Sequence, residues 1–310
     1  MSKEFKKTVG EGKTFNRKIS ISGHFITNSM ILFKKTSQLQ AYLQNERSHG
    51  NNIGFVPTMG ALHKGHLSLI TASKQDNGIT VASIFVNPAQ FNDKKDFDKY
   101  PAAIEKDIEL LVAAGCDVLF WPAVEEIYPE GYDQPVHYEL GYLEVLLEGK
   151  YRPGHFQGVC RVMNRLLHIV QPDNLYMGQK DYQQCMVVNR LLAIIQSPAR
   201  LHACPTLRET DGLAMSSRNM RLNDDERKKA VTISVTLKYL KENIQQGNVN
   251  AVIEKSKSLL AEKNFRVDYV AVSNARTLEP VTSWDGKQKI VALIAAFQNE
   301  VRLIDNMLLN

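Results

Sequence analysis

The fold of this chain is decided by the stretch Gly54-Phe55-Val56-Pro57-Thr58-Met59-Gly60-Ala61-Leu62-His63-Lys64-Gly65-His66. Its apolar first residues predict a strand that ends at Pro57, and two histidines close the stretch. Residues 67–73 then have the composition of a helix. A strand, a tight loop and a helix N-terminus thus follow one another. Such a junction offers backbone N–H groups and the positive end of a helix dipole to an anion such as phosphate.

The composition is that of a soluble globular protein. Of the 310 residues, 44% are hydrophobic and 23% are charged, which suits one large or two ordinary domains. No apolar run approaches the roughly 18 residues that span a bilayer. The N-terminus also lacks the apolar core of a secretory signal. We therefore expect no membrane association and no secretion.

The net charge of +5 belongs mostly to the N-terminal tail. Residues 1–29 contain six lysines and arginines against two glutamates, a net charge of +4, so the rest of the chain carries only +1. The basic balance therefore says little about the folded body, and we expect no nucleic-acid partner.

The same tail is polar and shows little periodicity, so residues 1–29 are expected to form a disordered basic extension. Met30 opens a more apolar segment, and one hypothesis is that translation begins there; mass spectrometry of the native N-terminus tests it. A mitochondrial transit peptide fits less well, because such peptides are rich in arginine and poor in acidic residues.

The four cysteines give no metal-binding pattern. None forms a C-x-x-C pair and no histidine cluster accompanies them, which argues against a zinc site at Cys116, Cys160, Cys185 and Cys204. Each lies in an apolar neighbourhood. We interpret them as reduced, buried residues of a cytoplasmic protein.

Strands and helices are expected to alternate over most of the chain. The strands are predicted at residues 53–56, 79–86, 117–121, 174–177 and 200–204. The helices are predicted over residues 37–46, 67–77, 101–114, 158–169 and 182–196. The nearly continuous apolar run 79–86 is typical of a strand buried on both faces of a parallel sheet. The order predicts a doubly wound, Rossmann-like α/β domain over residues 30–205.

The pattern changes near residue 206. A polar loop over 206–222 precedes two predicted helices, 224–245 and 250–263. Predicted strands follow at residues 266–273, 289–297 and 301–305, the last two joined by a hairpin turn at 298–300. Residues 206–310 are therefore expected to form a smaller α+β lid domain.

Four polar clusters follow predicted strands, at the opening loop and at residues 87–90, 178–184 and 215–218. Ligands bind at the carboxyl ends of strands in such sheets. His63 and His66, three residues apart, share a helix face. Without a third ligand they make a poor zinc site. They can instead donate to a transferring phosphate, or merely cap the helix and pack.

For each of the other clusters, both a functional role and a purely structural role are possible. Lys180 can offer a point charge to a phosphate, and Asp181 can cap a helix or bind magnesium, or both can lie in a solvated turn. Residues 215–218 offer two hydroxyls and a guanidinium, which suits a lid over a polyphosphate or a cap for the next helix. Gln90 and Gln184 suit a substrate with hydroxyls or a carboxylate, although isolated glutamines are usually surface residues.

Together these segments resemble the pantothenate synthetase (pantoate–β-alanine ligase) family. The resemblance covers residues 30–310 in order and spacing, and it rests on residues 57–66, 85–91, 152–156, 178–184 and 211–219. The H-x-G-H element alone is shared across the nucleotidyltransferase superfamily, whereas the combination is far more specific. The resemblance implies that ATP and pantoate form pantoyl adenylate, which β-alanine then attacks to give pantothenate and AMP.

The resemblance also implies roles for individual residues. The catalytic set is His66, His63, Lys180 and Arg218. The nucleotide set is Met59, Gly60, Ala61, Leu62, His63, Lys64, Gly65, His66, Gly178, Gln179, Lys180, Asp181, Leu207, Met215, Ser216, Ser217 and Arg218. The substrate set is Gln90, Gln184, Asn87 and Arg152, with Gln90 also close to β-alanine. Mg²⁺ arrives with ATP and is expected near Asp181, and a cytoplasmic homodimer is implied.

Two features depart from the family pattern. Residues 1–29 have no counterpart in the typical member, and Gln179 stands where many members carry glutamate. Both side chains accept a hydrogen bond, so we expect retained function with an altered local charge. Three alternatives remain open: another nucleotidyltransferase with a nucleotide-linked product, a class I aminoacyl-tRNA synthetase, or a non-catalytic nucleotide sensor on the same fold.

Overall fold

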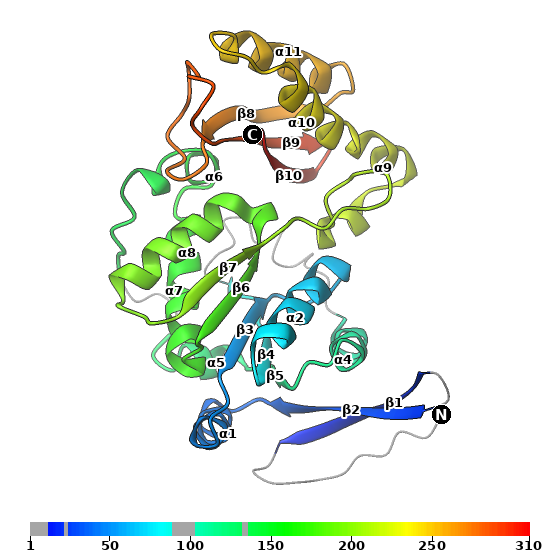
Figure 1. Cartoon of the computed structure of the whole chain (residues 1–310), viewed down its shortest axis with the longest axis vertical. Coiled ribbons are helices and arrows are strands. Elements are labelled where there is room, and N and C mark those ends of the chain that lie inside the picture. Colours follow the sequence, from blue (N-terminus) through cyan, green and yellow to red (C-terminus); the bar gives the residue numbers. More distant parts are fainter. Residues whose placement is uncertain (1–11, 22–23, 89–102, 132–135) are drawn as a thin grey trace. The chain divides into compact units, whose positions relative to one another are not determined.

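A computed structural model describes residues 12–21, 24–88, 103–131 and 136–310 (Figure 1). The chain divides into two compact units. The first unit comprises Met1–Val145, Arg152–Gly178 and Gln184–Cys204. The second comprises Leu146–Tyr151, Gln179–Gln183 and Pro205–Asn310. The sequence did not predict that two short segments from the first two thirds of the chain belong to the second unit.

The first unit contains a seven-stranded sheet in the order β1-β2-β5-β4-β3-β6-β7. Its strands are β1 (Lys13–Ile21), β2 (His24–Phe33), β3 (Ile53–Thr58), β4 (Ile79–Ile84), β5 (Val118–Phe120), β6 (Asn174–Gly178) and β7 (Arg200–Cys204). All neighbours from β2 to β7 pair in parallel, and only β1 is antiparallel to its neighbour. The predicted doubly wound α/β sheet is confirmed.

β3 lies inside this sheet, between β4 and β6 (Figure 1). The chain proceeds from β3 to β4 and β5 on one side, and then returns to form β6 and β7 on the other side. The direction of winding therefore reverses between β3 and β6, which is where doubly wound sheets bind ligands. The opening loop of the sequence follows β3 directly, so it stands at this switch point.

Helices connect the strands of the first unit. They are α1 (Thr36–Ser48), α2 (Lys64–Asp76), α4 (Ile104–Ala113), α5 (Val124–Ile127), the 3-10 helix η2 (Gly141–Glu144), α7 (His155–Val170) and α8 (Tyr182–Ile194), which belongs to this unit from Gln184 onward. One buried cluster joins α2 and α4 to the sheet through Leu69, Ile70 and Leu111. Gly54 permits this packing, because a Cβ there would lie 2.2 Å from Ser73 Oγ on α2. Among the described residues, no helix is long and apolar enough to span a membrane.

The expectation for the N-terminal extension is wrong for most of its described part. β1 and β2 form an antiparallel pair from Lys13↔Leu32 to Ile21↔His24, and the end of β2 pairs with β5. Phe15 packs against the buried cluster of the sheet. The alternation of Phe15, Ile19 and Ile21 with polar residues is a strand pattern. The prediction considered only composition and charge and therefore missed this pattern. Residues 1–11 lie outside the described ranges.

The second unit is built on a three-stranded antiparallel sheet in the order β10-β9-β8. Its strands are β8 (Arg266–Asn274), β9 (Ile290–Gln298) and β10 (Val301–Leu308). Its helices are α6 (Glu148–Tyr151), η3 (Gln179–Asp181), η4 (Ser217–Arg221), α9 (Asp224–Ala230), α10 (Thr232–Asn243) and α11 (Val249–Ala261). A buried core joins α10 and α11 to the sheet. The predicted α+β character and hairpin are confirmed, whereas the single helix expected over residues 224–245 is two helices.

Candidate active site

The loop after β3 wraps around a buried carboxylate. Gly60 and Ala61 have left-handed backbone conformations, with φ of 85° and 50°. The N–H groups of Ala61 and Leu62 donate to the two carboxylate oxygens of Asp107, each at 2.8 Å. Asp107 lies on α4 and is 1% exposed. Burial raises the pKa of Asp107, and the two backbone hydrogen bonds oppose that rise.

The two histidines that follow are locked together at the start of α2. Nδ1 of His63 accepts from the Gly65 N–H at 3.1 Å, and Nδ1 of His66 accepts from the His63 N–H at 3.3 Å. Their ring centroids lie 4.0 Å apart. A neutral imidazole whose Nδ1 accepts carries its proton on Nε2, so we assign both rings the Nε2–H form. Each ring therefore presents a neutral N–H donor.

These contacts correct the simplest expectation for the loop. The backbone N–H groups that already have partners within the protein belong to Gly60, Ala61, Leu62, His63, Gly65 and His66. Those N–H groups are therefore not available to phosphate. This differs from the expectation drawn from the strand–loop–helix pattern. The side chain of Lys64 in this loop is exposed, and those of His63 and His66 are half-buried.

Four residues are expected to hold pantoate, and three of them lie in the described part of the chain. Asn87, after β4, is 1% exposed; its amide donates to Gly158 O at 3.3 Å and accepts from the Tyr128 hydroxyl at 3.0 Å. Its side chain thus ties the residues directly after β4 to α7 and to Tyr128. Gln184 is half-buried on the first turn of α8, and Arg152 Nη1 lies 3.0 Å from His155 Nε2. Gln90 lies outside the described residues.

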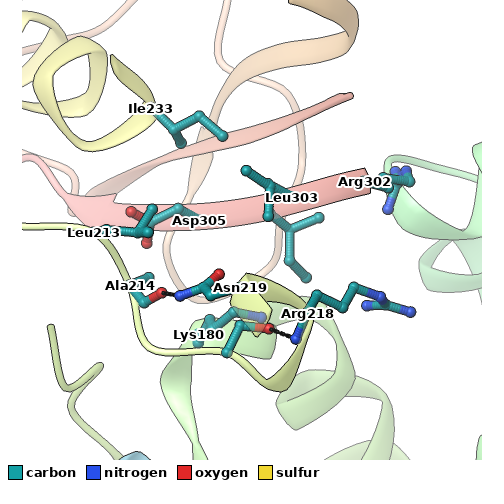
Figure 2. A pocket seen from close by; sticks show the side chains of 11 residues that line it. Lys180, Leu213, Ala214, Arg218, Asn219, Ile233, Arg302, Leu303 and Asp305 are labelled. Carbon is teal, nitrogen blue, oxygen red and sulfur yellow. Dashed lines mark hydrogen bonds between the residues drawn. The ribbon is translucent and has the colours of Figure 1, made fainter. Parts of the chain in front are cut away.

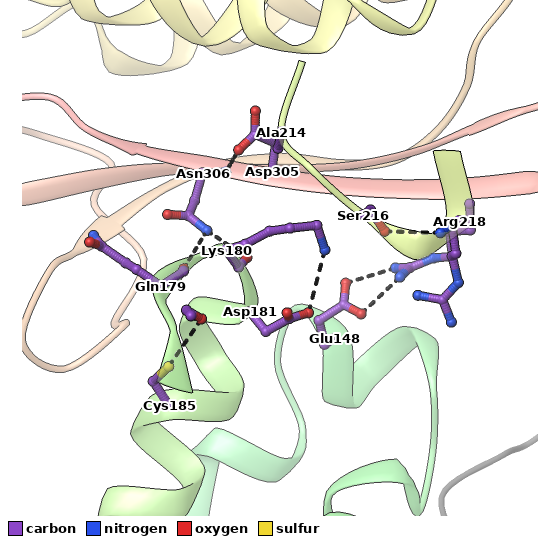
Figure 3. Close-up of polar contacts among 12 residues, drawn as sticks. Glu148, Gln179, Lys180, Asp181, Cys185, Ala214, Ser216, Arg218, Asp305 and Asn306 are labelled. Carbon is purple, nitrogen blue, oxygen red and sulfur yellow. Dashed lines mark hydrogen bonds and ion pairs between the residues drawn. The ribbon is translucent and has the colours of Figure 1, made fainter. Parts of the chain in front are cut away.

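In the second unit, η3 carries Lys180 and Asp181 directly after Gly178, the last residue of β6. Figure 3 shows the Asn306 amide of β10 donating to the carbonyl oxygens of Gln179 at 2.9 Å and Lys180 at 2.7 Å. Lys180 Nζ lies 3.7 Å from Asp181 Oδ1. The Asn306 amide therefore holds the backbone at this junction through its carbonyl groups. The backbone from which the Lys180 side chain extends is thereby fixed.

The polar loop of the second unit is also ordered by its own backbone. The N–H of Met215 donates to Leu207 O at 3.0 Å, and Arg208 and Ala214 form a β-bridge. Ser216 caps η4, because its Oγ accepts from the Arg218 N–H at 3.2 Å. Ser217 is the first residue of η4. This loop presents its hydroxyls and guanidinium from a defined turn.

A pocket of the second unit joins this loop to η3 and the sheet (Figure 2). It is lined by Lys180, Leu213, Ala214, Ser216, Arg218, Asn219, Ile233, Arg302, Leu303, Ile304 and Asp305. Lys180 and Arg218, two positively charged residues of the predicted site, therefore line the same pocket as Ser216. The Asn219 amide donates to Ala214 O at 3.0 Å, while its buried Oδ1 has no hydrogen-bond partner among the described residues.

A buried ion pair supports the same region. The Arg208 guanidinium donates to both oxygens of Asp305, at 2.6 and 3.0 Å, and also to Asn306 O at 3.1 Å. Burial raises the pKa of Asp305, and the Arg208 hydrogen bonds oppose the rise. Asp305 precedes the residue that holds Gln179 and Lys180, so the pair orders the support of η3.

A second network ties α6 to the sheet of the second unit. Arg302 donates from both Nη atoms to Glu148, each at 2.8 Å, and from Nε to Asp268 at 2.8 Å. The Tyr269 hydroxyl donates to the same Glu148 carboxylate at 2.8 Å. Burial raises the pKa of this tyrosine. These bonds explain why Leu146–Tyr151 belongs to the second unit.

Sequence reasoning missed the supporting residues Asp107, Asp305 and Asn306. A signal was present, because Asp107 falls on the apolar stripe of its helix with Ile104 and Leu111. Asp305 likewise occupies an inward strand position in line with Val301 and Leu303. An acid at an apolar register position indicates a buried partner. Within the described ranges, no group of three or more His, Cys, Asp or Glu side chains could hold a metal ion.

Comparisons with known proteins agree with this architecture. A profile of the family described as Pantoate-beta-alanine ligase matches residues 31–308. The pantothenate synthetase of Cytophaga hutchinsonii is 44% identical over 283 residues, covering 90% of this chain and 99% of the relative. That of Acetivibrio thermocellus is 45% identical over 285 residues, with the same shares covered.

Solved structures give the same result. The crystal structure of pantothenate synthetase from Thermus thermophilus has a TM-score of 0.83 at 42% identity, covering 90% of this chain and 99% of that chain. The pantoate-beta-alanine ligase of Francisella tularensis, solved with beta-gamma ATP and beta-alanine, has a TM-score of 0.77 at 35% identity, with 90% and 98% covered.

The switch-point sheet and the small antiparallel unit thus define a nucleotidyltransferase-like α/β enzyme. More narrowly, the chain belongs to the pantoate–β-alanine ligase family, as its sequence motifs predicted. It is a ligase of the pantothenate-forming class.

Proposed function

We propose that this chain catalyses the ATP-dependent condensation of (R)-pantoate with β-alanine, through pantoyl adenylate, to give pantothenate, AMP and pyrophosphate. Family membership supports the overall reaction. The observation that supports the roles below is the His63–His66 pair, whose hydrogen bonds assign both rings the Nε2–H form at the switch point of the sheet.

In the first step a pantoate carboxylate oxygen bonds to the α-phosphorus of ATP, and the bond to the pyrophosphate oxygen breaks. Negative charge grows on the departing pyrophosphate, so preorganised donors accelerate the step. His66, assisted by His63, is proposed to supply neutral N–H donors in the first unit. Lys180 and Arg218 are proposed to supply positive charge to the phosphates from the second unit.

The rest of the nucleotide set is proposed to bind ATP by shape and hydrogen bonding: Met59, Gly60, Ala61, Leu62, Lys64, Gly65, Gly178, Gln179, Asp181, Leu207, Met215, Ser216 and Ser217. The backbone N–H groups of Ala61 and Leu62 already donate to Asp107, so those residues would contribute surface rather than donors. The turn at Met215–Arg218 is proposed as the lid that keeps water from the mixed anhydride.

In the second step the β-alanine nitrogen bonds to the acyl carbon of pantoyl adenylate, and the bond from that carbon to the AMP oxygen breaks. Gln90 and Gln184 are proposed to hold pantoate through its hydroxyls, with Gln90 also near β-alanine. Arg152 is proposed to pair with a substrate carboxylate, and Asn87 to keep the neighbouring loop in place through Tyr128.

Mg²⁺ is proposed to enter with ATP rather than as a resident ion. Asp181 fits as its single protein ligand, because its side chain is 46% exposed and Mg²⁺ is usually bound by one or two carboxylates together with substrate phosphates and water. The ion would neutralise charge on the phosphate oxygens. Omitting magnesium is expected to abolish AMP formation, which a titration with EDTA measures.

A cytoplasmic homodimer is proposed as the working form. The four cysteines are free thiols, as expected for a reducing compartment. The first unit exposes the apolar side chains Val136, Tyr142 and Val145, which suits a surface that a second copy covers. Sedimentation equilibrium at micromolar concentration tests the dimer, and a monomer there would contradict it.

The reaction itself has a direct test. The protein is incubated with ATP, magnesium and D-pantoate, with and without β-alanine, while AMP and pantothenate are followed. We expect pantothenate and sustained AMP release only when β-alanine is present. A failure of AMP release to depend on β-alanine would reject the proposed reaction and favour another nucleotidyltransferase activity.

The role of the histidine pair is tested by His66→Ala. We expect the single-turnover rate of adenylation to fall by about 10²-fold or more, as for the loss of one preorganised donor. The matched control is His168→Ala on the exposed last turn of α7, which should leave the rate unchanged. An unchanged rate in His66→Ala would remove His66 from the catalytic set.

A further inference from the structure

We propose that Asp107 is the positioning residue of the histidine loop: its buried carboxylate is a built-in anion that shapes Gly60–Leu62 and thereby orients His63 and His66. This inference rests on the proposed role of the two histidines in adenylation. Asp107 is not part of any motif that led to the family, and it lies on a different helix from the histidines.

The loop has the geometry of an anion-binding nest. Successive residues with left-handed backbone conformations turn consecutive N–H groups toward one point, and such concavities commonly bind anions. Here Gly60 and Ala61 supply the left-handed turn, and the Ala61 and Leu62 N–H groups converge on Asp107. Each N–H donates to a different carboxylate oxygen, at 2.8 Å. The nest is therefore occupied by a side chain of the protein itself.

The position of the carboxylate is transmitted to the histidines through a single residue, Leu62. Leu62 N–H is fixed by Asp107, and the next N–H, that of His63, donates to Nδ1 of His66. His63 in turn accepts from Gly65 through its own Nδ1. A rotation of the backbone at Leu62 would therefore break the contact that keeps the His66 proton on Nε2.

The surroundings of Asp107 favour this role over two others. The side chain is 1% exposed and both of its oxygens accept backbone N–H groups, so it is poorly placed to bind a metal ion or to take a proton from a substrate. A carboxylate in such a place costs folding free energy. A leucine there would complete the apolar stripe of α4 but would leave two buried N–H groups without an acceptor.

The central variant is Asp107→Asn, which keeps the shape of the side chain. Its amide can accept from only one N–H group, and its NH₂ must face the other. We expect kcat for adenylation to fall by about 10²-fold, the effect of a small misplacement of catalytic groups, while KM for β-alanine changes little. Asp107→Glu retains both oxygens and is expected to recover part of the lost rate.

A readout separate from activity decides between positioning and general damage. The ¹⁵N chemical shifts of the two imidazoles report which ring nitrogen carries the proton. We expect the Nε2–H form for both rings in the native protein and a mixture of tautomers in Asp107→Asn. Glu109→Gln, the same change of charge on the exposed side of α4, is the control and should alter neither the shifts nor the rate.

The outcomes separate this inference from the proposed function. Unchanged imidazole shifts in Asp107→Asn would overturn the positioning role, whatever happens to the rate. Altered shifts with an unaltered adenylation rate would confirm the structural link and reject the catalytic role of the histidines. If Asp107→Asn does not fold, the same shifts measured in Asp107→Glu decide the question.

Discussion

The chain leaves the parallel sheet at two neighbouring strands, β3 and β6, and the junctions that follow are supported in opposite ways. After β3, two backbone N–H groups point to the carboxylate of Asp107. After β6, two backbone carbonyl groups accept from the amide of Asn306. The first support comes from a helix of the first unit and the second from a strand of the second unit.

The difference shows two ways in which a side chain of the protein satisfies the backbone of a turn. Inward N–H groups require an acceptor, and a carboxylate provides two strong ones. Inward carbonyl groups require a donor, which the neutral NH₂ of an amide provides without a buried charge. In both junctions, backbone groups of the turn are therefore satisfied by a side chain of the protein itself.

The largest expected effect concerns the ion pair behind the second support. Asp305→Ala leaves the half-buried Arg208 guanidinium without its carboxylate, and we expect a loss of about 3 kcal/mol of unfolding free energy. Urea denaturation measures it. The control Asp225→Ala removes the partner of an exposed ion pair and should cost less than about 1 kcal/mol. Equal losses in the two variants would show that Arg208–Asp305 is no stronger than a surface pair.

The glycines of the two junctions provide the next test. Gly60→Ala places a Cβ 3.1 Å from Asp107 Oδ2 at a φ of 85°, which should cost about 1–3 kcal/mol. Gly178→Ala meets no atom within 4 Å, so its stability should change by less than about 1 kcal/mol. Thermal unfolding compares the two variants. A Gly60→Ala protein as stable as Gly178→Ala would mean that the nest around Asp107 is not strained.

The smallest expected effect is that of Asn306→Ala. The substitution removes two hydrogen bonds to the carbonyls of Gln179 and Lys180, and about 1–2 kcal/mol of stability should be lost. KM for ATP should also rise, because the backbone that carries Lys180 is no longer held. Asn243→Ala, at the exposed end of α10, is the control for loss of an asparagine amide. An unchanged KM for ATP would confine Asn306 to a structural role.

The sequence predicted the family and the local order of its motifs along the chain. His63 and His66 lie at the start of α2, directly after β3, a strand inside the parallel sheet, as the motif predicted. The prediction for residues 1–29 was wrong over residues 13–21 and 24–29, because β2 pairs with β5 and β1 pairs with β2 in the same sheet. Such pairing depends on a strand far along the chain.

The amino-acid sequence by itself determined the alternation of strands and helices, the family and the position of each motif, because these depend on residues close together in the chain. Only the tertiary structure decided which groups hold the motifs. Asp107 lies 46 residues from Ala61, and Asn306 lies 126 residues from Lys180. The opening loop thus carries a pattern typical of phosphate binding, but packing against α4 turns two of its N–H groups toward a carboxylate. The physical reason is that a buried backbone donor must find an acceptor, and packing selects which one.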